Sequence, residues 1–258
     1  MIKIYGLVGK NISYSFSQFF FLKKFNIKNI KNTFYTIFDI KLIRLINIFI
    51  DRKKQIKGLN ITIPYKKKII NYIDLININL IKLESINTVK ILSKITIGYN
   101  TDISGFENSF KFKRKSYINN ALLLGNGGVS QSIIFVLNKL GIKYIVASRN
   151  QYTKYCIFYS DISLNIINNY NTIINCTPLG TYPNINICPN IPYMNISNQY
   201  YLYDLVYNPK ETLFLKIGKK KGSIINNGIN MLYLQANISC KIWYKIFYES
   251  IYERILHI

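Results

Sequence analysis

A glycine-rich turn between an apolar segment and a helical one restricts the fold of this chain more than any other feature. Residues 121–124 (Ala-Leu-Leu-Leu) predict a short buried strand, Gly125, Asn126, Gly127 and Gly128 follow it, and residues 129–140 predict a helix that ends at Gly141. Such a turn and the positive end of the helix, here near Val129, bind the pyrophosphate of a dinucleotide. Ser130 replaces the third glycine of the full pattern, so an ordinary tight turn is the alternative.

The next predicted strand, residues 143–147, indicates which dinucleotide is bound. It ends at Ser148, Arg149 and Asn150, about twenty residues after the glycine turn, where NAD-binding sites carry an acidic residue for the ribose hydroxyls. No acid is present here, and the guanidinium of Arg149 is suited to a 2′-phosphate. We therefore expect NADP(H) as the cofactor; an Arg149 that is only a surface cation is the alternative.

The rest of the chain alternates between strand-like and helix-like segments. Further strands are predicted at residues 2–8, 33–40, 57–63, 86–92, 95–99, 172–176, 201–206 and 223–225. Helices are predicted at residues 16–25, 42–50, 65–73 and 103–110, the last with Asp102 as N-cap, and from Met231 onward; residues 111–120 read as a connection. This alternation favours mostly parallel sheets covered by helices, and the new start at residue 121 predicts two α/β domains.

The net charge of +23, from 34 Lys and Arg against 11 Asp and Glu, has two interpretations. Clustered cations bind nucleic acid by releasing phosphate counterions. However, Lys, Asn, Ile, Tyr and Phe are all abundant, and all have A- or T-rich codons, so a nucleotide bias in the genome explains the same composition. The lysines are spread along the chain, with the densest runs at residues 66–68 and 219–221. We therefore expect no nucleic-acid partner.

Other classes are excluded by what the sequence lacks. The four cysteines, Cys156, Cys176, Cys188 and Cys240, form no C-x-x-C pair, and the one histidine, His257, is the second-last residue, so we expect no metal site and no Ser-His-Asp triad. No apolar stretch reaches the roughly 18 residues of a membrane helix, and the first residues do not resemble a secretory signal. We expect a soluble cytoplasmic protein with reduced thiols.

Polar residues gather at predicted strand ends in the first hundred residues. They are Ser13 and Ser15 after the first strand, Asn60, Thr62 and Lys66 around the third, and Asn87, Thr88, Asn100, Thr101 and Asp102 around the next two. Hydroxyls and amides can hold a small polyhydroxylated acid, and a Lys–Asp pair can move a proton. Each group has a simpler alternative: Lys66 as a solvated lysine, Asp102 as a helix cap, and the serines as caps of the helix near Phe16.

Together and in order, these motifs resemble those of the shikimate dehydrogenase family. The first-domain motifs are Tyr5-Gly6-Leu7-Val8-Gly9-Lys10, Ser13-x-Ser15, Asn60-x-Thr62-x-Pro64-x-Lys66, Asn87-Thr88-Val89 and Gly98-Tyr99-Asn100-Thr101-Asp102. The later ones are Leu124-Gly125-x-Gly127-Gly128, Asn175-x-Thr177-Pro178-Leu179-Gly180, Asp204-Leu205-Val206-Tyr207-Asn208-Pro209 and Gly228-x-x-Met231-Leu232-x-x-Gln235. The resemblance runs from about Tyr5 to Trp243.

The resemblance implies an oxidoreductase that reversibly reduces 3-dehydroshikimate to shikimate with NADPH, in chorismate and aromatic amino acid biosynthesis. It implies a substrate domain of residues 1–102, completed by C-terminal helices at 229–258, and a Rossmann-like NADP-binding domain at 103–228. Lys66 and Asp102 would be catalytic, and the substrate would be bound by Ser13, Ser15, Thr62, Asn87, Tyr207 and Gln235. The cofactor would be bound by Gly125, Asn126, Gly127, Gly128, Val129, Ser148, Arg149, Asn150, Thr177, Leu205, Gly228 and Met231.

The chain departs from the family pattern at Tyr14, Gln18, Tyr65, Asn126 and Asn227. None of these removes a group with a direct chemical role, and with the composition they suggest drift under maintained function. Alternatives are an NAD-using quinate/shikimate dehydrogenase, a folate dehydrogenase type, a cofactor-binding relic and a basic nucleic-acid-binding protein on a dinucleotide fold. Ser13-x-Ser15 and Asn100-Thr101-Asp102 disfavour the folate type, and the retention of Lys66, Asp102 and Gln235 disfavours the relic. A monomer or a homodimer would fit.

Overall fold

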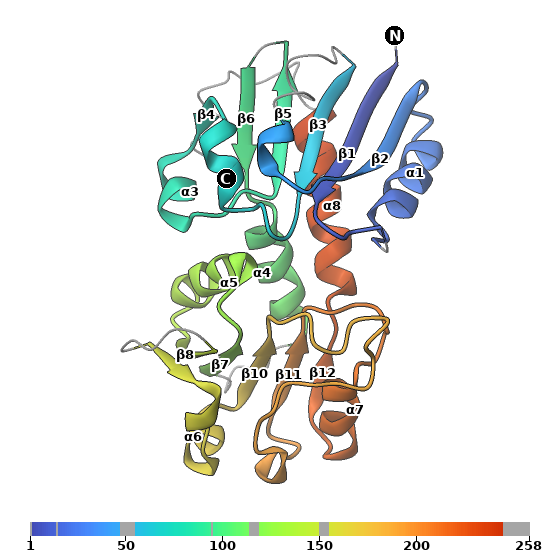
Figure 1. Cartoon of the computed structure of the whole chain (residues 1–258). Helices are drawn as coiled ribbons and strands as arrows, with labels where there is room; N and C mark the ends of the chain where they lie inside the picture. The colour runs from blue at the N-terminus through green and yellow to red at the C-terminus, as the bar shows by residue number, and fades with distance from the viewer. Residues whose placement is uncertain are drawn as a thin grey trace. The chain divides into compact units, whose positions relative to one another are not determined.

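The chain is described by a computed structural model at residues 2–13, 15–46, 55–93, 95–113, 119–149 and 155–244 (Figure 1). It divides into two compact units. The first unit comprises Met1–Thr101 with Ala236–Ile258, and the second comprises Asp102–Gln235. Each unit is built around one six-stranded sheet.

The sheet of the first unit is mostly parallel, with one strand reversed. Its strands are β1 (Lys3–Gly9), β2 (Thr33–Asp39), β3 (Ile56–Ile61), β4 (Leu75–Ile76), β5 (Thr88–Leu92) and β6 (Ile95–Tyr99), in the order β2-β1-β3-β5-β6-β4. β5 is antiparallel to β3 and to β6, whereas the other pairs are parallel. The amino end of β5 therefore lies at the same edge as the carboxyl ends of β1, β3 and β6.

Helical segments of the first unit are α1 (Ser17–Ile27), η1 (Ile43–Leu45), η2 (Lys68–Tyr72) and α3 (Ile78–Leu83). The helix predicted at 65–73 is present as the shorter 3-10 helix η2. The backbone carbonyl of Lys66 accepts a bond from Ile86 N (2.9 Å), so Ile70 N instead donates to Lys67 O (3.3 Å). Of the helix predicted at 42–50, η1 forms and residues 47–50 lie outside the described residues.

The last helix completes the core of the first unit. α8 (Ile229–Tyr244) belongs to the second unit up to Gln235 and to the first from Ala236 onward. Its Trp243 packs on Gly58 so closely that a Cβ at Gly58 would lie 2.2 Å from the indole nitrogen, and this nitrogen donates to Val89 O (3.0 Å). Trp243 also packs in a cluster with Tyr5, Phe21 and Tyr35.

The sheet of the second unit is entirely parallel. Its strands are β7 (Asn120–Leu124), β8 (Lys143–Ser148), β9 (Cys156–Phe158), β10 (Thr172–Asn175), β11 (Tyr201–Asp204) and β12 (Ile224–Asn226), in the order β12-β11-β10-β7-β8-β9. Counted from β7 as the first strand, this is the order 3-2-1-4-5-6 of dinucleotide-binding folds, in which the ligand lies where the order reverses. The Rossmann-like prediction is confirmed, and the reversal falls between β7 and β10.

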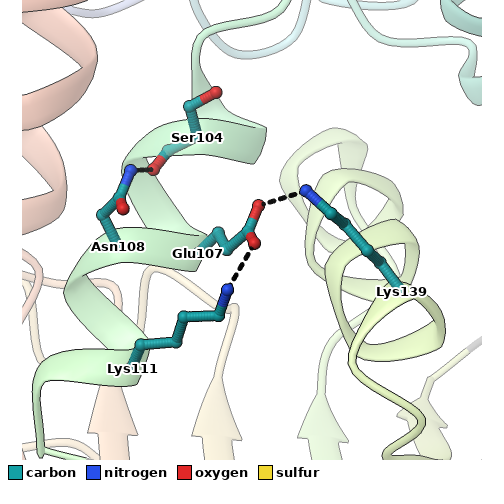
Figure 2. A network of polar contacts seen from close by, with 5 residues as sticks. All are labelled: Ser104, Glu107, Asn108, Lys111 and Lys139. Atoms are coloured by element: carbon teal, nitrogen blue, oxygen red, sulfur yellow. Dashed lines mark hydrogen bonds and ion pairs between the residues drawn. The ribbon is translucent and has the colours of Figure 1, made fainter.

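Helices of the second unit are α4 (Asp102–Lys113), α5 (Gly128–Lys139), α6 (Leu164–Asn169) and α7 (Leu213–Lys220), with short 3-10 turns η3 (Tyr159–Asp161) and η4 (Tyr193–Asn195). Figure 2 shows Glu107 of α4 between two lysines: it pairs with Lys111 one turn later (2.7 Å) and with Lys139 of α5 (2.9 Å). These bonds lower the pKa of the Glu107 carboxyl. α4 also extends past its predicted end at residue 110, and residues 114–118 of the predicted connection lie outside the described residues.

The ten strands predicted from the sequence are all present, with ends within two residues of those expected. Asp102 is the first residue of α4 rather than the residue before it. Within the described ranges, no helix combines the length and the apolar character needed to cross a bilayer.

Candidate active site

The loop after β1 carries the two predicted substrate serines next to the end of β3. The carboxylate of Asp39 accepts bonds from Asn11 N (2.9 Å) and Ile12 N (3.1 Å) and holds this loop. At its base, a Cβ on Gly9 would lie 2.6 Å from Thr62 Cγ2. Glycine thus lets the loop pass close to Thr62.

The two serines differ in their surroundings. Ser13 is exposed, whereas Ser15 is partly buried and its hydroxyl accepts a bond from Ser17 N (3.3 Å) in the first turn of α1. Ser15 therefore does bond to the start of the helix, as the simpler alternative required. The same hydroxyl donates to Ser17 Oγ (3.1 Å). Tyr14 lies outside the described residues.

Lys66 is partly buried, in contrast to the exposed Lys67 and Lys68 that follow it. The bond from Ile86 N to its carbonyl places Lys66 beside the amino end of β5. Its neighbour Tyr65 belongs to the core: it is 3% exposed, and its hydroxyl donates to Ile40 O (2.7 Å). Tyr65 therefore anchors the segment that carries Lys66 to the core of the first unit.

Three polar residues at this edge, Asn87, Thr88 and Thr101, are buried and bonded to one another. The partly exposed Asn60 is bonded to Thr88. The shortest bond runs from Thr101 N to Asn87 Oδ1 (2.7 Å), and Asn87 Nδ2 donates to Thr101 Oγ1 (3.0 Å). The first unit thus brings together the predicted residues Thr62, Lys66 and Asn87 at one edge of its sheet.

The remaining predicted catalytic and substrate residues lie in the second unit. Asp102 directly follows Thr101 and is 1% exposed at the start of α4. Gln235 lies on α8 where that helix meets α4, because a Cβ on Gly105 would be 3.2 Å from Gln235 Cβ. Tyr207 is partly buried after β11.

Gly125 and Gly127 in the turn after β7 are required for different reasons. Gly125 has φ +104°, and a Cβ there would lie 2.8 Å from Thr177 Cγ2. Gly127 has an ordinary φ of −91°, and a Cβ there would meet nothing within 4 Å. Neither the backbone nor the packing of the chain requires glycine at 127, so the open space above it is available to a ligand.

Ser130, which replaces the third glycine, closes the turn. Its fully buried hydroxyl donates to Gly125 O (2.8 Å) and accepts from Gly127 N (3.1 Å). The substitution therefore keeps the tight turn and fixes it to the first turn of α5.

Two of the predicted cofactor-binding residues, Thr177 and Leu205, follow the carboxyl ends of β10 and β11. A Cβ on Gly228 would lie 2.1 Å from Leu205 O, so only glycine allows this approach. Thr177 Oγ1 donates to Asn175 Oδ1 (2.6 Å), and Met231 is buried nearby in the core against α4. The structure thus places Gly125 beside Thr177, and Gly228 beside Leu205.

A buried carboxylate holds these loops in place by hydrogen bonds. Asp204 is fully buried and accepts bonds from Asn175 Nδ2 (2.9 Å), Val206 N (3.0 Å) and Thr212 Oγ1 (2.5 Å). Burial raises the pKa of this carboxyl to about 7, against these three bonds, which lower it. No role for Asp204 was predicted from the sequence, because its partners Asn175 and Thr212 are 29 and 8 residues away.

At the end of β8, Ser148 is buried and Arg149 is exposed. The Arg149 charge acts on the phenol of Tyr159 and opposes the rise in the Tyr159 pKa caused by burial. Arg149 is thus placed at the strand end where the 2′-phosphate was expected, whereas Asn150 lies outside the described residues.

Three departures from the family pattern have local hydrogen-bond roles. Asn227 Oδ1 accepts from Ile229 N (3.2 Å) at the start of α8, as a capping aspartate would. Gln18 Nε2 donates to Tyr35 O (3.1 Å), and Asn126 Oδ1 accepts from Gln131 Nε2 (3.2 Å).

Comparison with known proteins identifies the family. The family model for the shikimate dehydrogenase substrate binding domain matches residues 7–89. A shikimate dehydrogenase (NADP(+)) of Methanococcus maripaludis is 36% identical over 257 residues, which cover 93% of this chain and 91% of the relative. The chain belongs to the shikimate dehydrogenase family. A Clostridium botulinum shikimate dehydrogenase (NADP(+)) is also 36% identical, with 92% of this chain and 95% of that relative covered.

Solved structures of shikimate dehydrogenases have the same fold. One in complex with NADP+ is 30% identical, with a TM-score of 0.84 over 95% of this chain and 91% of that one. One from Peptoclostridium difficile is 31% identical, with a TM-score of 0.82 over 98% and 96%. The space above Gly127 and the start of α5 fit the dinucleotide of this family.

Proposed function

We propose that the chain catalyses the reversible NADPH-dependent reduction of 3-dehydroshikimate to shikimate. The observation that carries this proposal is the similarity to NADP-dependent shikimate dehydrogenases over nearly the whole length of both proteins. It is supported by the polar edge of the first sheet, where Thr62, Lys66 and Asn87 meet, and by the ligand space above Gly127.

The two units would bind different ligands. The first unit, Met1–Thr101 with Ala236–Ile258, would bind the substrate, and the second, Asp102–Gln235, would bind NADP(H). The boundaries expected from the sequence, 1–102 with 229–258 and 103–228, differ from these by one residue at the start of α4 and by seven residues within α8. Asp102 and Gln235 stand at the two ends of the second unit and would complete the substrate site.

Substrate recognition would use the hydroxyls and amides described above. Ser13, Ser15 and Tyr207 would hold the carboxylate, while Thr62, Asn87 and Gln235 would hold ring hydroxyls. The pyrophosphate would lie along residues 125–129, the 2′-phosphate at Ser148, Arg149 and Asn150, and the nicotinamide near Thr177, Leu205, Gly228 and Met231.

The chemistry then follows from the change at the ketone. Bound NADPH supplies a hydride to the carbonyl carbon. The electron pair of the C=O π bond moves to oxygen, and Lys66 Nζ stabilises this charge and donates the proton that forms the hydroxyl. Asp102 would orient the ammonium and the hydroxyl. In the reverse direction, neutral Lys66 would accept the hydroxyl proton as hydride leaves.

The direct test is a spectrophotometric assay at 340 nm with purified protein, NADPH and 3-dehydroshikimate. We expect oxidation of NADPH and a much lower kcat/KM with NADH. In the reverse direction, with the oxidised cofactor, we expect lower activity with quinate than with shikimate. Absence of turnover together with salt-dependent RNA binding would support the nucleic-acid alternative instead.

The catalytic assignment predicts the effect of removing one ammonium. Lys66→Ala should lower kcat by several orders of magnitude, about 10³-fold or more, with a smaller change in the KM for shikimate, because the charge acts mainly in the transition state. The matched control is Lys67→Ala, which removes an exposed lysine paired with Glu84 (2.5 Å). Near-normal turnover in Lys66→Ala would refute the assignment.

The oligomeric state, the partners and the location of the protein are also part of this proposal. We propose a monomer or homodimer with a small-molecule substrate and no nucleic-acid partner. A cytoplasmic location fits the four cysteines, all of which are free thiols. Size-exclusion chromatography with light scattering would determine the oligomeric state.

A further inference from the structure

A buried amide lies beneath the turn that follows β10 in the second unit. Asn175 is the last residue of β10 and is fully buried. Its oxygen bonds to the turn that follows it, and its nitrogen bonds to the neighbouring strand β11. A buried amide that is bonded at both ends is held rigidly, so it can set the position of residues that contact a ligand.

The oxygen of this amide holds Thr177. Asn175 Oδ1 accepts bonds from Thr177 N (3.0 Å) and from Thr177 Oγ1 (2.6 Å). Because the hydroxyl has one proton, this second bond fixes the side-chain orientation of Thr177. Thr177 Oγ1 also accepts a bond from Leu179 N (3.2 Å). The methyl group of Thr177 is thereby turned toward Gly125, where a Cβ would lie 2.8 Å from it.

The nitrogen of the amide is held by Asp204. Asn175 Nδ2 donates to Asp204 Oδ1 (2.9 Å), and the same carboxyl oxygen accepts a bond from Val206 N (3.0 Å). A reversed amide would place its oxygen against this oxygen of Asp204 and its nitrogen against the N–H of Thr177. Both contacts are unfavourable, so the carboxyl group of Asp204 permits only one orientation of the Asn175 side chain.

The turn of Thr177 packs against the glycine turn that follows β7. Cys176 N donates to Leu124 O (2.9 Å), so the two turns leave the sheet next to each other. Thr177 Cγ2 lies beside Gly125, whereas no atom of the described residues lies within 4 Å of a Cβ built on Gly127. A shift of Thr177 would therefore disturb the glycine turn at Gly125, next to the space inferred for the ligand.

We propose that Asn175 is a positioning residue for the dinucleotide: held by Asp204, it fixes Thr177, and through Thr177 it fixes the glycine turn that receives the pyrophosphate. The inference rests on the proposed function and deepens it, because it adds a residue that acts on the cofactor without touching it. The simpler alternative is a purely structural Asx turn, on which the affinity for the cofactor does not depend.

The test compares two substitutions at Asn175. Asn175→Leu has a similar size and removes both ends of the amide. We expect it to weaken NADP+ binding about tenfold or more in calorimetric titration at pH 6, as for one lost binding contact, with an unchanged KM for shikimate. Asn175→Asp is the conservative variant. Two carboxyl groups this close share a proton, so residue 175 still accepts from Thr177 and donates to Asp204, and NADP+ affinity at pH 6 should stay within about threefold of the original.

The matched control is Asn226→Leu, the same change at the last residue of β12. Asn226 is also buried, but its nitrogen donates to Ser109 O (3.2 Å) and Tyr201 OH (3.1 Å), which belong to neither turn. Asn226→Leu should lower the melting temperature and leave the NADP+ affinity within about twofold of the original. This control separates a loss of stability from a loss of position.

Each outcome has a defined meaning. An unchanged NADP+ affinity in Asn175→Leu, or equal weakening in Asn175→Leu and Asn226→Leu, overturns the inference, and so does an Asn175→Asp that binds NADP+ as weakly as Asn175→Leu. If Asn175→Leu does not fold, Asn175→Ser removes the amide and leaves a small polar side chain. It should weaken NADP+ binding in the same way, and an unchanged affinity overturns the inference. An original protein that binds NADP+ but does not oxidise shikimate refutes the proposed function alone, because the affinities can still be compared.

Discussion

At the scale of single residues, two glycines of one turn are present for unrelated reasons. Gly125 is required by the chain itself, through its positive φ and its contact with Thr177. Among the described residues nothing requires glycine at 127, because its backbone is ordinary and none of their atoms lies within 4 Å of where a Cβ would be. This difference is a physical reason to infer a ligand above Gly127, and a motif match cannot supply it.

Alanine at these two positions should therefore have opposite effects. Gly127→Ala should change the stability by less than about 1 kcal/mol but weaken NADP+ binding about tenfold or more, because its methyl group occupies the approach to the pyrophosphate. Gly125→Ala should lower the free energy of unfolding by about 1–3 kcal/mol, since it strains the backbone and crowds Thr177. Calorimetric NADP+ titration and thermal unfolding would check both. Tight NADP+ binding by Gly127→Ala would contradict the proposed path of the dinucleotide.

Residues that occur in short motifs could be predicted as site residues from the sequence, whereas residues that act through long-range contacts could not. Thr177 and Leu205 were expected near the cofactor, and the structure places each against a glycine of the same site. Ser239, which is bonded to Asn60, had no local signal, because the two residues are 179 positions apart. The role of Asp204 was hidden for the same reason.

At the scale of elements, Asp204 joins three of them under the cofactor edge. It is the last residue of β11, accepts a bond from the last residue of β10, and accepts another from Thr212, the N-cap of α7, whose hydroxyl also accepts from Leu215 N (3.4 Å). One carboxyl thus sets the positions of two strand ends and the start of a helix.

This carboxyl should make stability depend on pH. Its pKa is about 7 in the folded protein and 3.8 in the unfolded chain, so between these values the folded state holds a proton that the unfolded state has lost. The contribution of Asp204 to stability is therefore complete below about pH 4, falls as the pH rises to about 7, and changes no further above that. Nearby Cys176, whose pKa burial raises to about 12, stays neutral throughout.

Asp204→Asn should remove this part of the pH dependence. We expect the difference in unfolding free energy between pH 5 and pH 7.5, measured by urea denaturation, to shrink in the variant, because its amide does not titrate. The exposed Asp161→Asn is the control and should leave the difference unchanged. An equal pH profile in Asp204→Asn and the original protein would show that Asp204 is ionised when folded.

Strands and helices could be predicted from the sequence where the local residue pattern determines them. Apolar runs identified most of the strands, whereas β4, β9, α3, α6 and α7 were not predicted. The segment 65–73 was predicted as a helix from its pattern, but a contact with Ile86, some 20 residues away, takes the carbonyl of Lys66. No property of the segment itself reveals that contact.

At the scale of the whole molecule, the few acidic residues are concentrated at structural positions. In the described part of the chain, Asp39, Asp74, Asp161 and Asp204 accept backbone bonds, and Glu84, Glu107 and Glu211 pair with lysines. Asp102 is proposed to orient the Lys66 ammonium and the substrate hydroxyl. This distribution fits drift in which acids were kept where the fold or the reaction needs them, while the net charge rose to +23.

An excess of positive charge on this scale should destabilise the compact state by repulsion. We expect a low melting temperature at low ionic strength, and a rise of several degrees as sodium chloride increases from about 0.01 to 0.2 M, where screening shortens from about 30 to 8 Å. Sodium sulfate at equal ionic strength would reveal specific anion binding. A melting temperature that is high and independent of salt would contradict both the repulsion and the drift hypothesis.

The packing of Trp243 on Gly58 has a consequence for how the protein is made. Translation delivers the first hundred residues long before residues 236–244, which their core contains. The intervening second unit has its own sheet and can form while the earlier segment still exposes aromatic rings. The part of the protein that is synthesised first is thus the last to reach its native state, and a ribosome that stalls before codon 243 releases a chain whose opening domain is unfinished.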